Sequence, residues 1–385
     1  MMEKLRQEFE DTYFAQISST KGIVQLAEKI GISKNSLRRF LGKLNDGTKP
    51  RIATLNMIAE SLGYQDFKDF SDNSEEEKNP IDFSVIKIFY ESVKGKGVIM
   101  GEERFQNVNY ELAEKIILDD KNLKHFMNYF YENPEALEYV LAWHPTYGKI
   151  AEKNYQNTLL KMAKITNNSH LKVFVHSFVF LGKFLSEDLS FEEAERQIKN
   201  LRKYVAQMRK NYHFFWTFPE VRFQIAEYLF EFLKSGKYIE KSNVKITDYS
   251  KIPNNYRFIY NIYLADALNL VGRFQEADVL QETNESHYYQ EDFENENYHS
   301  DTHILFSKIS RAITFFKLGD CQKANHLFRI ITNELSETKI PFDIKDYFEI
   351  QYFYLAAKLY PENKFYQKQF AEIVRKTNFT FFKKF

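Results

Sequence analysis

The chain has 385 residues, of which 13 are glycine, 8 are proline and 17% are aromatic. This composition disfavours all-β folds, which need frequent turn residues, and disordered chains, which carry few aromatic side chains. Its 53 basic and 53 acidic residues balance, which excludes a uniformly basic nucleic-acid-binding surface but not a local basic patch.

The cysteine content and the apolar runs limit the setting of the protein. Cys321 is the single cysteine, which excludes an intramolecular disulfide and a cysteine-based zinc site. No apolar run approaches the roughly 18 residues of a membrane span. The first ten residues include three glutamates and lack the apolar core of a secretory signal. We therefore expect a cytoplasmic protein that does not cross a membrane.

Residues 23–41, which read IVQLAEKIGISKNSLRRFL, have the pattern of two short helices joined by a tight turn. Ala27 is small where the second helix would cross the first, and Gly31 tolerates the positive φ that such a turn needs. Ser33 is placed to cap the second helix. The apolar residues expected to face inward are Leu26, Ile30, Ile32, Leu37 and Phe40. The spacing predicts a helix-turn-helix.

A further helix is predicted over residues 51–63, directly after Pro50. Its apolar face and its end are formed by Leu55, Ile58, Ala59, Leu62 and Gly63. Together, residues 23–63 resemble the lambda-repressor-like (Cro-type, XRE) DNA-binding domain, which ends its motif with Pro-x-x-x-x-Leu-x-x-Ile-Ala-x-x-Leu-Gly. The resemblance implies that residues 1–70 form a small all-α domain that binds double-stranded DNA. The turn at 42–49 is longer than is usual in that family.

Local charge favours the same interpretation. Eight basic residues and only two acidic ones lie between positions 21 and 51, and basic residues near phosphates release counterions on binding. Asn35 suits adenine, whereas Arg38 or Arg39 suits guanine or a phosphate. Both arginines cannot face the centre of the groove, and the sequence leaves open which one does. The predicted DNA contacts are Ser33, Lys34, Asn35, Ser36, Arg38, Arg39, Lys43 and Lys49.

The segment 71–82, SDNSEEEKNPID, is predicted to be an acidic linker to a second domain over residues 83–385. In that domain apolar residues recur at steps of three and four, which indicates helices rather than strands. The predicted helices cover residues 110–117, 123–131, 135–142, 154–165, 171–185, 191–209, 218–233, 256–271, 275–281, 302–318, 322–335, 344–359 and 364–375.

Two parts of this domain repeat a pattern of a helix, a glycine and then an alanine five positions later. Gly272 is followed by Ala277, and Gly319 by Ala324. Glycine permits a left-handed helix end, and the small alanine lets the next helix pack closely. The pattern resembles the tetratricopeptide repeat, although the two glycines are 47 residues apart rather than about 34. It predicts an α-solenoid of stacked helical hairpins, with an irregular all-α domain as the alternative.

No catalytic constellation is present, so we expect neither an enzyme nor a cofactor. His299 and His303 lie near several acidic residues, but two histidines without a third ligand are a weak metal signal, and we interpret them as part of a solvated loop. The aromatic cluster at 213–218 is interpreted as core packing, with a ligand groove as the alternative. The commonest phosphate-binding and hydrolase motifs are absent.

These observations predict a DNA-binding transcriptional regulator whose helical-repeat domain binds a peptide or protein partner on a concave surface. A homodimer is expected, since two helix-turn-helix domains bound to half-sites one helical turn apart would raise the affinity for DNA. The alternative is that the protein is an interaction scaffold, whose helix-turn-helix docks protein rather than DNA. One form of this alternative places the scaffold in a defence or mobile-element system.

Overall fold

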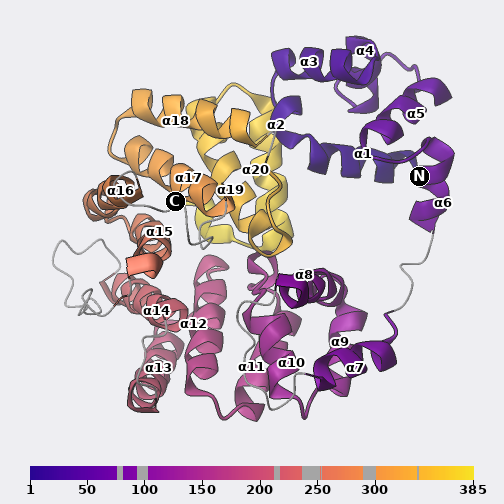
Figure 1. The fold of residues 1–385 in the computed structure, drawn as a ribbon. Helices are drawn as coiled ribbons and strands as arrows, with labels where there is room; N and C mark the ends of the chain where they lie inside the picture. The colour runs from indigo at the N-terminus through magenta and orange to yellow at the C-terminus, as the bar shows by residue number, and fades with distance from the viewer. Residues whose placement is uncertain are drawn as a thin grey trace. The chain divides into compact units, whose positions relative to one another are not determined.

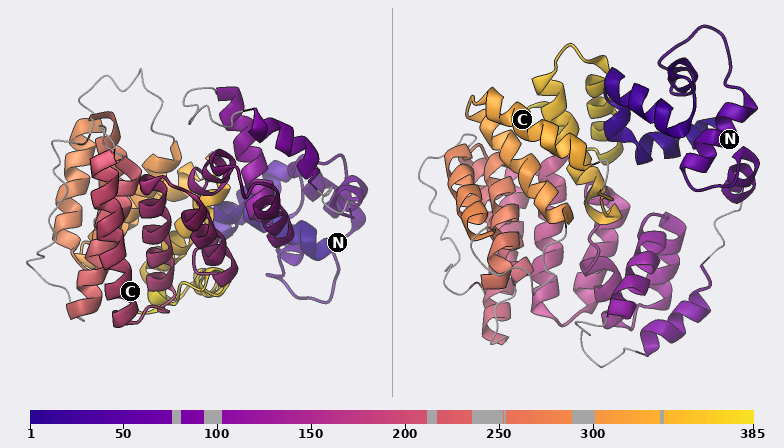
Figure 2. Two further views of the ribbon diagram at one scale, coloured as in Figure 1. Left: turned by 90° about the horizontal axis from the view of Figure 1, so that it is seen from below. Right: turned by 45° about the horizontal axis from the view of Figure 1, so that its top comes forward.

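The computed structural model describes residues 1–75, 81–92, 103–211, 217–235, 252, 254–288, 301–335 and 338–385. Every regular element in this part of the chain is a helix, and it contains no strand (Figure 1; Figure 2). The all-α prediction is therefore confirmed for the described chain. None of the helices described here is both long enough and apolar enough to span a membrane.

The chain divides into two compact units. The first comprises residues 1–81 with 329–338, and the second comprises residues 82–328 with 339–385. The predicted linker, 71–82, begins inside a helix that runs to Glu75. Its residues 76–80 lie outside the described part of the chain.

Six helices form the N-terminal part of the first unit: α1 (Met2–Thr12), α2 (Phe14–Ile17), α3 (Thr20–Ile30), α4 (Lys34–Phe40), α5 (Ile52–Ser61) and α6 (Phe67–Glu75). The fully buried side chains of Leu37 and Phe40 pack in its core. Phe9 of α1, a helix that the sequence pattern did not single out, meets Phe40 edge to face at 5.5 Å between ring centroids. Two of the residues expected to face inward, Ile30 and Ile32, are only half-buried.

The second unit is a succession of helices: α7 (Phe83–Glu91), α8 (Glu103–Ile117), α9 (Asp120–Tyr129), α10 (Pro134–Leu137), α11 (Lys153–Ile165), α12 (Ser169–Leu185), α13 (Phe191–Asn211), α14 (Thr217–Ser235), α15 (Asn254–Leu270), α16 (Phe274–Tyr288), α17 (Asp301–Lys317), residues 321–328 of α18 (Cys321–Glu334), α19 (Phe342–Leu359) and α20 (Lys364–Thr377). Each predicted helix is found, with four main differences, the first being that α8 begins at Glu103, seven residues earlier than expected. Residues 138–142 form a π-helical turn, α16 extends seven residues further than expected, and α7 was not predicted.

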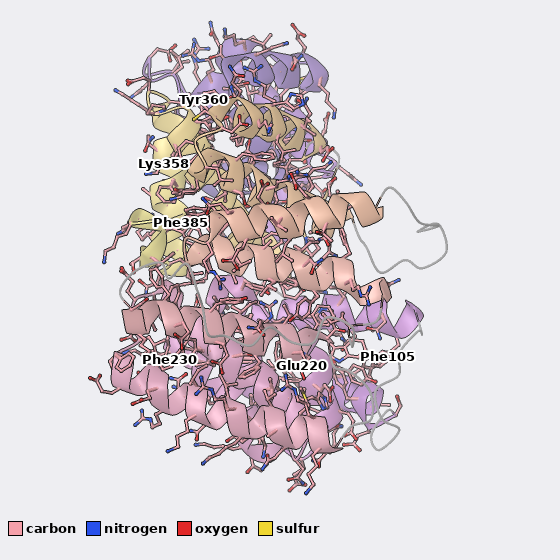
Figure 3. All side chains as sticks on the ribbon, turned by 90° about the vertical axis from the view of Figure 1, so that its left-hand side faces the viewer. Phe105, Glu220, Phe230, Lys358, Tyr360 and Phe385 are labelled. Atoms are coloured by element: carbon pink, nitrogen blue, oxygen red, sulfur yellow. The ribbon has the colours of Figure 1, made fainter. Side chains whose placement is uncertain are left out.

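From α10 to α17 each helix packs against the next one in the chain, and α19 packs against α20. Helices α13 and α14 illustrate the contacts. Arg209 donates two hydrogen bonds to the buried carboxylate of Glu220, at 2.8 and 2.6 Å. Phe191 stacks on Phe230, with ring centroids 5.8 Å apart; Glu220 and Phe230 are labelled in Figure 3. Polar and aromatic contacts thus join the same helix pair.

The two glycine turns have the expected conformation. Gly272 and Gly319 adopt φ values of 77° and 88°. In each turn the next N–H donates to a carbonyl five residues back, from Arg273 to Leu268 at 2.8 Å and from Asp320 to Phe315 at 2.9 Å. These bonds satisfy carbonyl groups that a helix end leaves without partners. The alanines that follow the two glycines, at positions 277 and 324, are fully buried.

A buried carboxylate joins α15 to α19 in the second unit. Asp266 accepts a hydrogen bond from the Tyr347 hydroxyl at 2.6 Å and another from Nε2 of Gln351 at 2.9 Å. Burial raises the pKa of Asp266 to about 6, and the two hydrogen bonds oppose this rise. The single oxygen of the same side-chain amide, Oε1 of Gln351, has no hydrogen-bond partner among the described residues.

A buried arginine on α14 lies near this carboxylate. The guanidinium of Arg222 lies over three rings, with its carbon 4.4 Å from the centroid of Tyr263, 4.9 Å from Tyr147 and 5.6 Å from Phe178. Burial lowers its pKa, and the charge of Asp266 works against this effect. Among the described residues, cation–π contacts rather than a direct ion pair therefore surround this charge.

Replacing Asp266 with Asn tests how much the ionisation of this buried carboxylate lowers the free energy of unfolding. An aspartate has a pKa near 3.9 in an unfolded chain, so between about pH 4 and pH 6 the folded state binds more protons. The free energy of unfolding therefore decreases as the pH rises through this range. We expect Asp266→Asn to remove on the order of 3 kcal/mol of this pH dependence, because an amide does not titrate. The substitution should be accommodated, because Oε1 of Gln351, which has no hydrogen-bond partner among the described residues, can turn to accept the new amide. Urea unfolding of both proteins from pH 4 to pH 8 measures it, and parallel pH curves would contradict it.

Candidate functional site

The turn between α3 and α4 is held by backbone and hydroxyl contacts. Gly31 adopts a φ of 83°, and the N–H of Ile32 donates to the carbonyl of Ala27 at 2.9 Å. The hydroxyl of Ser33 accepts the N–H of Ser36 at 3.0 Å, and the two serine hydroxyls are 2.9 Å apart. The predicted N-cap is therefore confirmed. Ser33 and Ser36, two of the predicted DNA contacts, therefore stabilise the start of α4.

Helix α4 has one buried face and one face that is open to solvent. Leu37 and Phe40 are completely buried. At 3.6 residues per turn, Asn35, Arg38 and Arg39 lie on the opposite face. Asn35 is exposed, as is Lys34 beside it, whereas the two arginines are half-buried.

The two neighbouring arginines differ in their contacts. Arg39 donates from Nε and Nη2 to one carboxylate oxygen of Asp46, at 2.8 and 2.7 Å. The other carboxylate oxygen accepts the N–H of Thr48 at 3.1 Å. The bond from Arg39 holds the pKa of Asp46 down at about 2. Arg39 thus ties α4 to the turn at 42–49, whereas Arg38 forms no ion pair within the described residues.

The remaining two predicted DNA contacts lie in the same turn. The amine of Lys43 donates to the carbonyl of Ile17 at the end of α2, so it stabilises the fold of the unit. Lys49 is exposed. Of the eight predicted residues, the open face of α4 therefore brings together Lys34, Asn35 and Arg38, and the turn adds Lys49.

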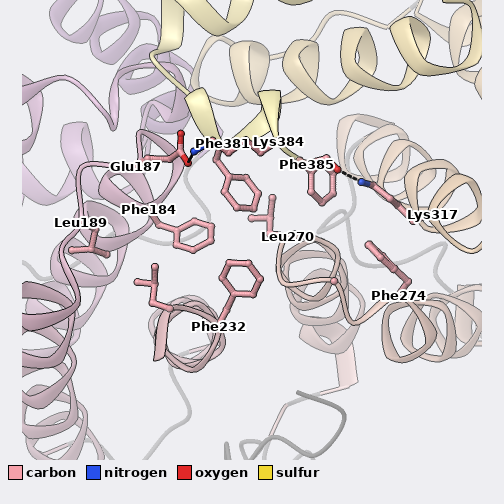
Figure 4. Close-up of a pocket in the computed structure, with 12 residues that line it drawn as sticks. Phe184, Glu187, Leu189, Phe232, Leu270, Phe274, Lys317, Phe381, Lys384 and Phe385 are labelled. Carbon is pink, nitrogen blue, oxygen red and sulfur yellow. Dashed lines mark hydrogen bonds and ion pairs between the residues drawn. The ribbon is translucent and has the colours of Figure 1, made fainter. Parts of the chain in front are cut away.

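A cavity of about 490 Å³ lies in the second unit, where the C-terminal ends of α12, α14, α15 and α17 meet the segment after α20 (Figure 4). Three of its rings point toward one another: the ring centroid of Phe184 is 4.8 Å from that of Phe381 and 6.0 Å from that of Phe232. The aromatic residues of the lining are Phe184, Phe232, Phe274, Phe381 and Phe385. Concave, mostly apolar sites of this size are typical of small-molecule binding.

Charged groups stand at two places in this pocket. Glu187 accepts a hydrogen bond from Lys384 at 2.6 Å. The amine of Lys317 donates to a backbone oxygen of Phe385, the last residue of the printed sequence. Burial, together with the charge of Lys358, lowers the pKa of Lys317 to about 8. No local sequence signal identifies this pocket, because its residues come from segments up to 201 positions apart.

The histidines and the aromatic cluster that the sequence analysis considered do not form a further site within the described residues. In the described residues, no group of three or more His, Cys, Asp and Glu side chains is placed to hold a metal ion. His299 and residues 213–216 of the aromatic cluster lie outside the described residues. Comparisons with protein-family models, curated proteins and solved structures found no match to this chain.

Removing the cap of α4 tests how its start is held. We expect Ser33→Ala to lower the local stability of α4 by about 1 kcal/mol, because the N–H of Ser36 loses its acceptor. Ser19→Ala is the matched control, since the Ser19 hydroxyl caps α3 by accepting the N–H of Gly22 at 2.9 Å. Native-state hydrogen exchange of the two helices measures both effects. Equal changes in α4 from both substitutions would contradict the assignment.

Proposed function

We propose that the chain is a sequence-specific DNA-binding transcriptional regulator in which α3, the turn at Gly31 and α4 form a helix-turn-helix. The observation that carries the proposal is the open face of α4, where Lys34, Asn35 and Arg38 stand together opposite a fully buried face. A capped helix with such a face has the donors and acceptors that read base edges in the major groove.

The contacts of the two arginines support different roles for them. Arg38 is the residue we assign to a base edge, since an arginine without an ion pair can donate two hydrogen bonds to guanine. Arg39 is the positioning residue, because its bond with Asp46 holds the turn at 42–49 against α4. Lys34 and the exposed Lys49 suit phosphate contacts, which position a protein on DNA without reading its sequence.

The second unit is, in this proposal, a tetratricopeptide-like solenoid that binds a peptide or protein partner and forms the homodimer. The two glycine turns, the buried alanines after them and the packing of successive helices support stacked hairpins. Dimerisation would place two copies of α4 on half-sites one helical turn of DNA apart.

Selection of bound duplexes from a random DNA library, with the full chain at about 150 mM salt, tests the function first. We expect one sequence motif to be enriched, and a palindrome if the protein acts as a dimer. A well-folded protein that enriches no sequence, and that binds no DNA at low salt, would overturn the proposal in favour of a unit that docks protein.

Two substitutions separate base reading from phosphate binding. We expect Arg38→Ala to weaken binding to the selected site by about 1–3 kcal/mol, with little effect on unrelated DNA. Lys49→Ala should weaken binding to both DNAs alike and reduce the slope of log affinity against log salt by about 1. Fluorescence anisotropy titrations at several salt concentrations measure both effects.

Lys364→Ala is the control for these titrations, because Lys364 is exposed at the start of α20 in the second unit. Circular dichroism confirms that each variant is folded. Unchanged specific binding by a folded Arg38→Ala protein would show that α4 does not read the bases through this residue.

A further inference from the structure

Helix α13 of the second unit buries one face and exposes the opposite one. The buried residues recur at steps of three and four: Ala194, Ile198, Leu201, Val205 and Met208. At 3.6 residues per turn, the opposite face carries four exposed basic residues: Arg196, Lys199, Lys203 and Lys210. Between the first and the last of them the helix rises about 21 Å. These four residues are called the α13 basic row below.

No acidic side chain interrupts this row. Residues 196–211 include six basic residues and no acidic one, and the acidic residues of α13 lie within its first five positions. An exposed helix face commonly alternates basic and acidic residues, which then pair at steps of four. Lys199 and Lys203 are four apart and repel each other instead. The helix dipole favours a positive charge in the last turn, at Lys210, but not at these two lysines in the middle of the helix.

The other two basic residues of this stretch have a structural use. Arg202 donates two hydrogen bonds to the carboxylate of Glu227 on α14, both at 2.7 Å. Arg209 is bonded to Glu220 of the same helix in the same way. The three lysines of the row form no ion pair with a carboxylate in the described part of the chain. Packing against α14 therefore explains the arginines and leaves the lysines without a structural role.

A neighbouring helix repeats the pattern. Residues 153–165, which form α11, include three lysines and no acidic residue. All three, at positions 153, 161 and 164, are exposed. Because α11 and α13 both pack against α12 (Figure 1), the excess of positive charge is a property of this part of the second unit rather than of one helix.

The uncharged residues between these cations indicate what the row binds. They are Asn200, Ala206 and Gln207, and along residues 196–211 no large apolar side chain lies on this face. A helix that binds a membrane surface inserts aromatic or aliphatic side chains, and a protein interface is anchored by such residues. Lysine amines and side-chain amides are donors to phosphate oxygens. The face is therefore suited to a phosphate backbone.

We propose that the α13 basic row binds phosphates of the DNA backbone outside the sequence that α4 reads. A duplex carries one negative charge per about 1.7 Å of its axis, so a row about 21 Å long meets several phosphates. Because both units belong to one chain, DNA bound by the first unit is presented to the second at a high effective concentration. The inference rests on the proposed function and adds to it a contact that does not depend on sequence.

Two duplexes that share the selected site test the proposal, one with about 5 and one with about 25 flanking base pairs on each side. We expect the full chain to bind the long duplex at least about fivefold more tightly, with a steeper slope of log affinity against log salt, because more counterions are released. Lys199→Gln combined with Lys203→Gln should bring the ratio of the two affinities close to one. Fluorescence anisotropy measures both affinities.

The matched control is Lys121→Gln combined with Lys124→Gln. Both lysines are exposed on α9 of the same unit, beside Asp119 and Asp120, so this variant loses the same charge without touching the row and should keep the ratio. Hydroxyl-radical cleavage of the long duplex measures the contact directly. We expect protection outside the selected site with the parent and the control, and none with the Lys199→Gln, Lys203→Gln protein. Circular dichroism confirms that each variant is folded.

The outcomes separate this inference from the proposed function. A protein that selects no DNA sequence overturns both. Equal affinity of the parent for the two duplexes, or an unchanged ratio in the folded Lys199→Gln, Lys203→Gln protein, overturns the inference alone and leaves base reading by α4 intact. If the parent binds phosphatidylserine vesicles, the variant does not, and duplex length has no effect, the row belongs to a membrane surface and the inference is again overturned.

Discussion

The buried hydrogen bonds of α15 are the constraint on which the second unit depends. Apolar helix faces can slide or rotate against one another at small cost, whereas a buried polar group that loses its partner is expensive. Asp266 joins α15 to α19, and Asn269 joins it to Ser310 of α17 at 3.0 and 3.1 Å. Asn261 donates to Asn284 of α16 at 2.8 Å. One helix is thus held in register with three others.

This register also places the pocket. Leu270, at the end of α15, and Gly272, in the turn after it, both belong to the pocket lining. A shift of α15 by one residue would move these two positions and break the bonds of Asn269 and Asp266 together. The same interior contacts that give the unit its packing therefore also hold part of the lining of this cavity in place.

The first unit is stabilised differently, because its proposed DNA-binding surface lies on a short helix. Seven residues form few internal hydrogen bonds, so α4 depends on its cap at Ser33, on the burial of Leu37 and Phe40, and on the bond between Arg39 and Asp46. These contacts use the inner face and the two ends of the helix. They leave Asn35 and Arg38 on a supported helix, which is the arrangement that direct base recognition requires.

The sequence by itself determined most of the helices from α3 onward, though not α7, because the signals that start and end a helix act over a few residues. Ser33 as a cap, the left-handed glycines at 31, 272 and 319 and the apolar periodicity all belong to this class, and the structure confirms them. Predicted burial was less exact at Ile30 and Ile32, since it depends on which helix packs across them. The π-helical turn at 138–142 was likewise not visible in the periodicity.

Only the tertiary structure distinguished Arg38 from Arg39, because the partner of Arg39 is seven residues away, in a turn whose path the sequence does not specify. Only the tertiary structure brought Phe184, Lys317 and Phe381 to one pocket, since nothing local relates segments so far apart. Long-range neighbours depend on how whole helices stack, and that is set by the sum of many interior contacts rather than by any short pattern.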